Sequence, residues 1–344
     1  MISPISQLSR RILRGAMGTW LASLLVSLSI SAICDATPTI VAFPESSEVP
    51  ANTDGWQFGL KLGASTDWKA EQYRPGIDSG HYWTVGLLAV GTTNYLHNDF
   101  QWRGKLTVGV GYNKTPSDDR FIKTADELSL ETSNYWAFGG WWGSFGLFRY
   151  DTSMMQGIDV QRNPVTYNIT DINGNVTSIQ GDTLVLNEPF LPSYLTQAIG
   201  LFFRPITYDF FKTEFRIGVY AREVFTDGQL FVLGKSNNIV DVKTLSTYYE
   251  LGPLVGSTIA GDIVPKTIFY NMSLGFGYPV WVTSAVPIGT DFVDRVTGEV
   301  TTEVTIKPFT WLNLTWSFKG IYMPEIVEGF QYDSKFVASF PLIL

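Results

Sequence analysis

The stretch that decides the fold is Phe100–Asn113, with the sequence FQWRGKLTVGVGYN. Every second position from Phe100 to Tyr112 is apolar or glycine, and the positions between them include Arg103 and Lys105. Successive side chains of an extended chain point to opposite sides, so this alternation predicts a β-strand. A strand that rises about 3.3 Å per residue with a tilt of about 45° covers roughly 30 Å in 13 residues, the thickness of a bilayer core. The apolar face has aromatic residues at both ends and aliphatic residues between them, as a membrane-spanning strand has.

The composition agrees with a β-protein that has lipid on its outer surface. The chain of 344 residues is 45% hydrophobic and only 16% charged, and it contains 11 Trp, 16 Tyr, 23 Phe and 32 Gly. No segment after the N-terminal leader approaches the roughly 18 continuous apolar residues that a spanning helix requires, so a membrane location implies a barrel. The net charge of −8 argues against a nucleic-acid partner, because phosphate binding depends on clustered Lys and Arg.

The N-terminus has the pattern of a secretory signal peptide. Three arginines at positions 10, 11 and 14 precede the apolar run Gly15–Ile33, and small residues suited to cleavage after Ala32 or Ala36 follow. The alternative is an uncleaved anchor. We expect a signal peptide, a periplasmic lead-in and a barrel over residues 1–32, 33–54 and 55–344. The single cysteine, Cys34, excludes a disulfide framework and a cysteine-based metal site.

Ten further stretches are interpreted as strands. Their alternation is clearest in Phe211–Phe225 and Lys266–Val280, weak in Thr124–Trp136 and poor in Val242–Leu251. With Phe100–Asn113 they make eleven predicted strands: Trp56–Thr66, Tyr82–Tyr95, Phe100–Asn113, Thr124–Trp136, Phe138–Asp151, Thr196–Tyr208, Phe211–Phe225, Val242–Leu251, Lys266–Val280, Pro308–Lys319 and Phe330–Leu344. Bacterial single-chain barrels normally have an even number of strands. We therefore predict an all-β, transmembrane, antiparallel up-and-down β-barrel of twelve strands, with ten as the second choice and the miscounted strand within Phe225–Val264.

The connections between the strands of the first half alternate between long and short, as they do in barrels with short periplasmic turns and longer outside loops. The longest connection is Gln156–Ser193, and it contains Asp171-Ile172-Asn173-Gly174-Asn175. Asn-Gly between apolar runs is a strong hairpin signal, so a β-hairpin is predicted outside the membrane over about 156–193. Phe225–Asp241 and Val282–Thr305 are interpreted as loops, the second with a turn at Thr297-Gly298.

Alternation assigns the side chains of these strands to two environments. Facing the lumen we expect Arg103, Lys105, Lys212, Glu214, Arg216 and Arg222. Facing lipid we expect Trp102, Leu106, Val108, Val110, Phe215, Ile217, Val219, Met272 and Leu274. The lumenal charges have two interpretations, which are a lumen that selects anionic or polar solutes and a set of paired charges that fills the interior.

No catalytic centre, cofactor site or metal site is predicted. His81 and His97 stand at the two ends of one strand, so they do not form a metal pair or part of an obvious triad. The Asp171–Asn175 segment lacks the spacing and the bidentate Glu of a calcium loop. Asp118-Asp119 and Asp126-Glu127 are interpreted as solvated loop edges, with a cation site as the alternative.

A secreted soluble β-sandwich is the alternative fold, because its strands also alternate. Strands of 12 or more residues exceed the usual length of about 5–6 residues in soluble sheets. The aromatic residues gather at the ends of the apolar faces, and the charges of Lys212, Glu214 and Arg216 lie mid-strand with glycines around them. These three features favour the membrane barrel.

Several residues resemble a family of uncharacterised bacterial outer-membrane β-barrel proteins that is defined only as a domain of unknown function. The resemblance covers Gly55–Tyr150 and is carried by Trp56, Gly59, Gly63, Trp102 and a Lys-x-x-Asp-x-Leu element at Lys123–Leu128. The chain departs from the usual terminal Phe of outer-membrane proteins, because it ends Phe340-Pro341-Leu342-Ile343-Leu344. The resemblance implies a fold and a location in the bacterial outer membrane, but no activity.

Two functions of different classes remain open for such a barrel. The first is a narrow pore for a small polar solute. The second is a structural or adhesive role in which the outside loops bind a partner. In both cases we expect a non-enzymatic protein without cofactors, whose partners are outer-membrane lipid and the barrel-assembly machinery.

Overall fold

The structure is a computed structural model, and it describes residues 54–71, 80–114, 121–236, 238–283, 295–322 and 330–343. The predicted signal peptide (1–32), nearly all of the lead-in (33–54) and the pair Asp118-Asp119 lie outside these residues. Within the described ranges, no helix has the length and apolar character that crossing a membrane requires.

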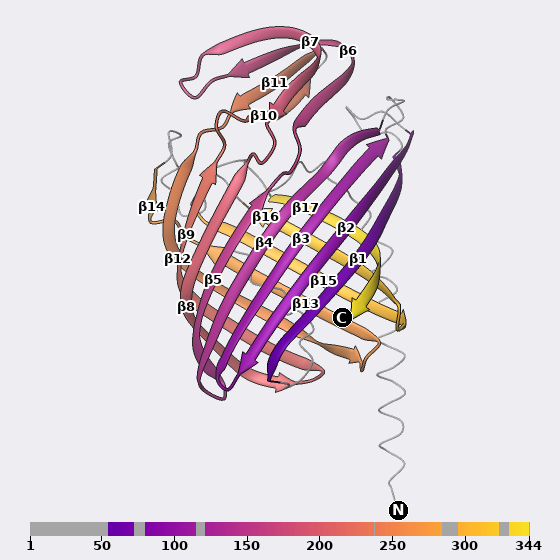
Figure 1. Ribbon diagram of the computed structural model, residues 1–344. Coiled ribbons are helices and arrows are strands. Elements are labelled where there is room, and N and C mark those ends of the chain that lie inside the picture. The colour runs from indigo at the N-terminus through magenta and orange to yellow at the C-terminus, as the bar shows by residue number, and fades with distance from the viewer. Residues whose placement is uncertain are drawn as a thin grey trace, which may run out of the picture. The chain divides into compact units, whose positions relative to one another are not determined.

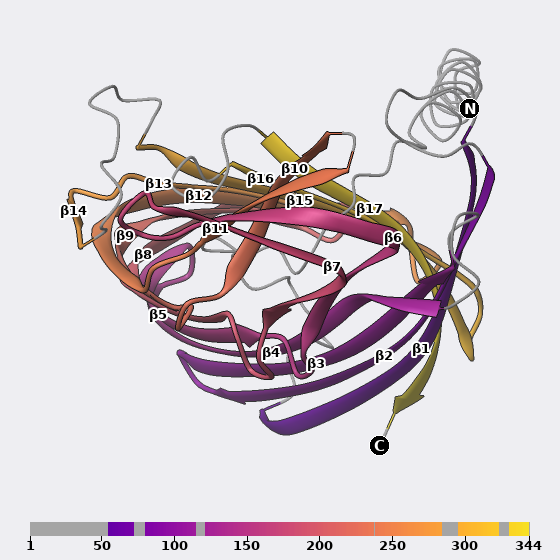
Figure 2. The same ribbon diagram turned by 90° about the horizontal axis from the view of Figure 1, so that it is seen from above.

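Twelve antiparallel strands close into a barrel, which confirms the predicted fold and strand number (Figures 1 and 2). They are β1 (Gly55–Glu71), β2 (Gly80–His97), β3 (Phe100–Lys114), β4 (Phe121–Gly139), β5 (Trp142–Thr152), β8 (Ser193–Tyr208), β9 (Phe211–Phe225), β12 (Tyr248–Val264), β13 (Ile268–Gly277), β15 (Thr297–Phe309), β16 (Leu312–Tyr322) and β17 (Phe330–Ile343). Each strand pairs with the next in this series. β17 pairs with β1 from Gly59↔Ile343 to Ser65↔Val337, which closes the barrel. A two-residue strand, β14 (Trp281–Val282), extends the sheet beside β12.

The two ends of the barrel differ in their connections. Turns of two or three residues join β2 to β3, β4 to β5, β8 to β9, β12 to β13 and β15 to β16, all at one end. The start of β1 and the end of β17 lie at the same end, since Gly55 pairs with Leu96 beside the β2–β3 turn. The longer connections leave from the opposite end. In bacterial barrels the short turns and both chain ends lie in the periplasm, and the longer loops lie outside.

Two insertions at the long-connection end build a separate four-stranded sheet. Its strands are β6 (Gly157–Thr170), β7 (Val176–Asn187), β10 (Leu230–Ser236) and β11 (Ile239–Thr244), in the order β10-β11-β6-β7. A parallel pairing of β11 with β6, from Ile239↔Thr166 to Lys243↔Thr170, joins the two hairpins. The sheet has its own small core of Val165, Tyr167, Leu184, Val240 and Val242. We call it the outside sheet.

The β6–β7 turn lies where the Asn-Gly signal predicts it. The Asp171 carboxylate accepts hydrogen bonds from the backbone N–H groups of Asn173 and Asn175, each at 2.8 Å, and from the Asn175 side chain at 2.9 Å. These bonds, first among them the one from the Asn175 side chain, lower the pKa of Asp171 below its usual value. Gly174 has a φ of 86°, a conformation that side chains with a Cβ rarely adopt.

The predictions for Phe225–Asp241 and Val242–Leu251 are wrong. The supposed loop contains β10 and the start of β11, which complete the outside sheet. The supposed strand Val242–Leu251 joins the end of β11 to the start of β12 across the link 245–247, and the barrel strand is Tyr248–Val264. Alternation is poor there because the chain passes from one sheet to another.

The strand missing from the prediction is β15, which lies in the segment interpreted as a loop and not within Phe225–Val264. Thr302 stands between Val300 and Val304 on its outward face, so the apolar row is broken in the sequence. Thr297-Gly298 is not a turn. Gly298 pairs directly with Phe276 of β13, whose ring atoms would lie 3.3 Å from a Cβ at this position, so the glycine leaves room for the ring.

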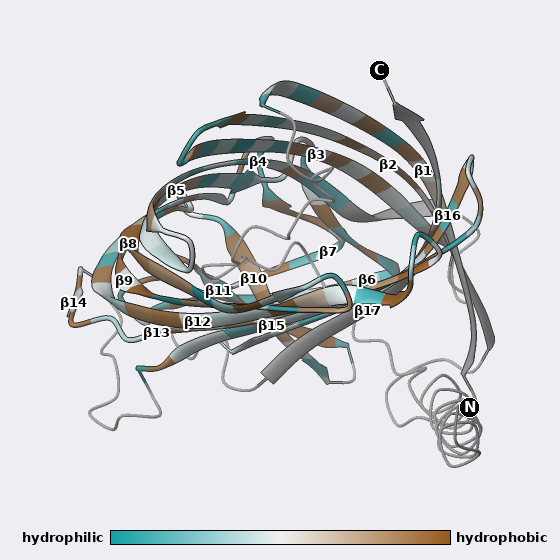
Figure 3. Ribbon diagram, turned by 90° about the horizontal axis from the view of Figure 1, so that it is seen from below, coloured by the Kyte–Doolittle hydropathy of each residue, from teal (hydrophilic) through white to brown (hydrophobic). Residues whose placement is uncertain are grey.

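The outer surface of the barrel is divided into an aromatic and an aliphatic zone. Large aromatic side chains are exposed near the short turns: Trp56, Phe58, Trp136, Phe138, Trp141, Tyr208, Phe210, Phe309 and Trp311. Farther along the strands most exposed side chains are aliphatic, among them Leu62, Leu87, Leu106, Leu130, Ile199, Ile217, Val219, Leu251 and Val255, with a few aromatic ones such as Phe148, Phe215 and Phe276. Figure 3 shows hydrophobic and hydrophilic residues alternating along the coloured parts of the strands. An aliphatic band beside an aromatic girdle is the surface that a barrel presents to a bilayer.

Candidate functional site in the barrel interior

Charged residues form a row across one wall of the interior. Residues that lie directly opposite each other on adjacent strands connect β3, β4, β5, β8, β9 and β12 in the order Lys105, Glu131, Arg149, Thr196, Arg222 and Glu250. Side chains of directly opposed residues on one face of a sheet are close enough to interact. The row therefore places basic and acidic groups next to each other, with one threonine between them.

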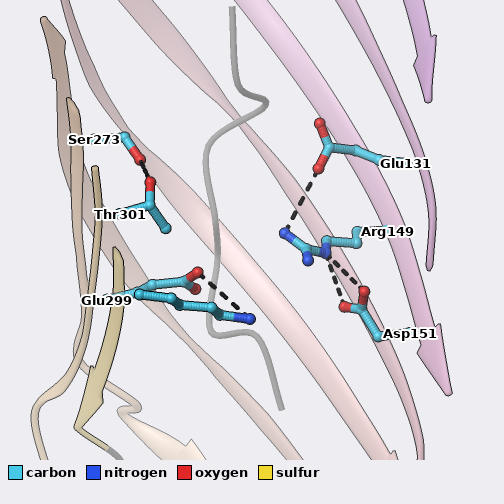
Figure 4. Close-up of polar contacts among 7 residues, drawn as sticks. Glu131, Arg149, Asp151, Ser273, Glu299 and Thr301 are labelled. Carbon is cyan, nitrogen blue, oxygen red and sulfur yellow. Dashed lines mark hydrogen bonds and ion pairs between the residues drawn. The ribbon is translucent and has the colours of Figure 1, made fainter. Parts of the chain in front are cut away.

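Arg149 is the centre of an ion-pair group within this row (Figure 4). Its Nε lies 2.8 Å from the Asp151 carboxylate, and its Nη1 lies 3.6 Å from Glu131. Farther along the row, Arg222 and Glu250 form an ion pair of 2.6 Å, and both side chains have no solvent exposure. Two buried opposite charges in contact offset much of each other's desolvation cost, which a single buried charge would carry alone.

A second group, which we call the arginine–aromatic cluster, contains Arg103, Arg204, Arg216, Glu214, Tyr135 and Phe202. Arg204 donates to the Glu214 carboxylate at 2.6 Å, and Arg216 also contacts this carboxylate. The guanidinium carbons of Arg103 and Arg204 lie 4.8 and 5.1 Å from the Tyr135 ring centroid, and that of Arg204 lies 4.4 Å from the Phe202 ring. Two guanidinium groups therefore contact one carboxylate, and a third lies over the same tyrosine ring.

The opposite wall, built by β13, β15 and β16, carries smaller polar groups. The Ser273 and Thr301 hydroxyls share a hydrogen bond of 2.6 Å, and those of Thr305 and Thr315 share one of 3.0 Å. Glu299 is the charged exception. It is 3% exposed, lies 4.0 Å from Lys319, and projects from its wall toward the Arg149 group in Figure 4. The interior is thus asymmetric, with large charged and aromatic groups on one side and hydroxyl groups on the other.

Solvent exposure also differs from one part of the interior to another. Side chains of β4, β5, β8, β9 and β12 pack into a buried core of Tyr135, Phe145, Leu147, Ala198, Phe202, Tyr220 and Leu254. Inward-facing polar residues of β3, β15 and β16, among them Lys105, Thr107, Thr301 and Ser317, keep partial exposure. The core therefore fills the part of the interior next to these five strands, and only some polar groups of β3, β15 and β16 remain accessible to water, since Glu299 and Asn313 are buried, as is Ser273 of β13.

The structure places the six predicted lumenal residues in three settings. Arg103, Glu214 and Arg216 meet in the arginine–aromatic cluster. Arg222 lies in the charged row, as does Lys105, which is partly exposed. Lys212 belongs to neither group. Its side chain is 55% exposed and lies 3.9 Å from Asp209 in the β8–β9 turn, because the first residues of β9 are at the rim.

The residues predicted to face lipid all point away from the interior. Leu106, Phe215, Ile217, Val219 and Met272 are largely exposed. The others, Trp102, Val108, Val110 and Leu274, are partly exposed.

The sequence prediction missed several inward-facing residues: Glu131, Tyr135, Arg149, Asp151, Arg204, Glu250 and Glu299. A signal was present for some of them. Arg149 and Asp151 are in phase with each other on β5, and Arg204 is in phase with Thr196 and Gly200 on β8. Glu250 and Glu299 lie on strands with wrong or missing predictions. Among the described residues, no group of three or more His, Cys, Asp or Glu side chains is placed to hold a metal ion.

Asp126, the acidic residue of the Lys123–Leu128 element, is not a solvated loop edge. It is 5% exposed, and its carboxylate accepts the backbone N–H groups of Met154 and Met155 at 2.9 and 2.6 Å. Residues 153–156 link the barrel strand β5 to β6 of the outside sheet. Asp126 therefore fixes the chain at the point where it leaves the barrel.

A closed barrel with an apolar outer belt, a charged interior and short turns at one end is the fold of a transmembrane β-barrel of the outer-membrane type. Residues 78–158 match the family described as "Protein of unknown function (DUF3078)". This match includes the Lys123–Leu128 element. No curated protein matches the chain.

Solved structures with a similar strand arrangement come from several outer-membrane proteins. The translocator domain of autotransporter NalP from Neisseria meningitidis is 9% identical with a TM-score of 0.41, over 86% of this chain and 90% of that one. The beta domain of the Bordetella autotransporter Brka is 11% identical with a TM-score of 0.36, over 84% and 99%. An outer-membrane channel from Pseudomonas putida F1 is 7% identical with a TM-score of 0.38, over 86% and 97%.

Proposed function

We propose that this chain resides in the bacterial outer membrane and acts as a narrow pore for small polar solutes. The observation that carries the proposal is the partial exposure of some inward-facing polar side chains on β3, β15 and β16, in an interior that is otherwise filled by the buried core of β4, β5, β8, β9 and β12. Hydroxyl, amine and carboxylate groups that line a restricted passage replace part of the hydration of a polar solute. The buried core limits the passage to small molecules.

The pore is tested by single-channel recording of the purified protein in planar lipid bilayers. Thr301 faces the interior, and its neighbour Thr302 lies on the outward face between Met272 and Phe318. We expect Thr301→Trp to reduce the conductance severalfold, because the indole enters the passage, and Thr302→Trp to leave it unchanged. A wild-type protein without conductance, or two variants with equal effects, would contradict the pore.

The adhesive or structural role remains a second candidate because of the outside sheet. Ile158, Ile179, Val185, Leu233 and Ile239 are exposed on its strands, by 41 to 58%. Exposed apolar groups at a sheet surface are common features of protein–protein contacts. If the sheet mediates attachment, Ile179→Asp combined with Leu233→Asp would abolish surface attachment of cells and leave bilayer conductance intact. Unchanged attachment would remove this candidate.

A further inference from the structure

We infer that the arginine–aromatic cluster binds one small oxyanion, a carboxylate or phosphate group carried by the solute. This inference deepens the proposed pore function and rests on it. It names the class of solute that the lumen would select and the side chains that would hold it.

The charge of the cluster is unbalanced. Arg103, Arg204 and Arg216 each carry a full positive charge at any physiological pH, and the one acid within the cluster, Glu214, contacts Arg204 and Arg216. The hydrogen bond of Arg103 goes to the neutral side chain of Gln101 at 2.9 Å. Positive charge in a largely buried setting carries a desolvation cost of several kcal/mol unless a negative group compensates it. A bound anion supplies that group.

The cluster also contains hydrogen-bond donors for which a bound ligand could supply the acceptor. Among the described residues, Arg103 Nε, Arg204 Nη2 and the Tyr135 hydroxyl are buried atoms without a hydrogen-bond partner. Tyr135 is only 2% exposed. A carboxylate or phosphate accepts several hydrogen bonds at once and donates none when ionised, so its oxygens match this set of donors.

The aromatic rings hold the guanidinium groups in position before a ligand arrives. Arg103 and Arg204 lie over the Tyr135 ring, and Arg204 also lies over Phe202. Cation–π contacts of this kind fix the guanidinium planes while leaving their N–H edges available. The arginine side chains are therefore already ordered before a solute binds, so binding costs little further side-chain entropy.

Solvent reaches the cluster from the lumen. The Arg204 side chain is 28% exposed and that of Glu214 is 12% exposed. Arg204 also lies near the short-turn end of β8, where its backbone N–H binds the Trp141 carbonyl of the β4–β5 turn at 2.6 Å. An anion that enters from this end reaches the cluster early in its passage.

The site is tested by isothermal titration calorimetry of the full-length protein in detergent, with benzoate and inorganic phosphate as separate probes. We expect the double variant Arg103→Gln/Arg204→Gln to bind the preferred probe at least tenfold more weakly, and Glu214→Gln to bind it more tightly. The gain in Glu214→Gln keeps the test valid if the double variant folds poorly. Lys235→Gln, which removes a positive charge from the outside sheet, is the matched control and leaves binding unchanged.

The outcomes separate the inference from the pore itself. Tighter binding of benzoate identifies a carboxylate site, and tighter binding of phosphate identifies a phosphate site. Conductance without binding of either probe, or binding that ignores both cluster variants, would overturn the inference and leave the pore in place. Binding that follows the variants in a protein without conductance would overturn the pore and retain the anion site.

Discussion

At the scale of single residues, the barrel interior depends on polar side chains of adjacent strands that form ion pairs and hydrogen bonds with each other. Alternation alone assigned Arg103, Glu214, Arg216 and Arg222 to the inward face, because side chains of a strand alternate with a period of two. It did not reveal which of them meet. The contact of Arg204 with Glu214 depends on the register of β8 with β9, and register is set by turns and bulges that single-strand patterns do not contain.

Asp126 is the residue whose removal we expect to affect stability most clearly. Asp126→Ala leaves the N–H groups of Met154 and Met155 without their acceptor, and bonds from N–H groups to a carboxylate contribute about 1.5–3 kcal/mol each. We expect the free energy of unfolding in detergent to fall by about 2–4 kcal/mol, since the two bonds are not fully additive. Guanidinium titration measures this change. Asp182→Ala, an exposed acid in β7, should change it by less than about 0.5 kcal/mol, and equal losses would contradict the role of Asp126.

Ile217 tests whether lipid covers the outward face. It is 53% exposed in the aliphatic zone, and an Arg near the middle of a bilayer costs a barrel about 2–4 kcal/mol. We expect Ile217→Arg to lower the unfolding free energy by this amount in lipid vesicles. Gln197→Arg is the control, because an outward position that is already polar should lose no more than about 1 kcal/mol near an interface. Mature wild-type protein that stays in solution without detergent would refute the lipid contact.

At the scale of strands, length and alternation were sufficient where one face is uniformly apolar, as in β3 and β9. β15 was missed because threonines occupy both of its faces, and β12 was displaced because β11 of another sheet ends only three residues before it. The secondary structure of such segments is decided by their pairing with neighbouring strands and not by local sequence preference.

The β8–β9 pair contains a close backbone contact that requires glycine. Gly200 pairs with Gly218, and a Cβ on Gly200 would lie 2.2 Å from the Ile217 carbonyl oxygen. Backbone atoms cannot move away without disturbing the sheet, so Gly200→Ala should lower the unfolding free energy by about 1–3 kcal/mol or prevent folding. Gly146 of β5 pairs with Ile199 of β8 and has open space around its Cβ position, so Gly146→Ala is the matched control. Similar heat-modifiability of both variants on gels would exclude this role.

The β6–β7 turn should respond to acid. The folded pKa of Asp171 is lowered, so the turn is stabilised at pH values above the ordinary carboxyl pKa of about 4 and loses this stabilisation as the pH falls through the lower folded value. We expect the Asn175 side-chain amide resonances in NMR spectra to shift toward free values below about pH 4. In Asp171→Asn they should show no titration in this range. If the wild-type resonances titrate at the ordinary carboxyl pKa, the hydrogen bonds that Asp171 accepts in the turn are contradicted.

At the scale of the whole molecule, the even strand number and the contrast between short and long connections give the barrel a polarity. The outside sheet belongs to the long-connection end, to which four links of three to five residues attach it. The sequence indicated the barrel and the β6–β7 hairpin. It did not indicate that a second hairpin, β10–β11, pairs with the β6–β7 hairpin, because a parallel pairing between two insertions leaves no local signal in the sequence.

The polarity is tested by labelling cysteine variants with a membrane-impermeant maleimide. We expect Ser178→Cys in β7 to react in intact cells and Asn98→Cys in the β2–β3 turn to react only after the outer membrane is permeabilised. Both positions are exposed, so access alone decides the result. The reverse labelling pattern would invert the barrel and remove the basis for an outside sheet.

The parallel pairing of β11 with β6 also sets an order of construction. Asn168 and Asp241, which bond across this pairing, are 73 positions apart, and both strands of the β8–β9 hairpin are made between them. The β6–β7 hairpin has no partner strand until β11 is made, so an arrested or truncated chain that stops before β11 lacks the complete outside sheet. Whatever the outside sheet contacts, only chains that extend past β11 can engage it.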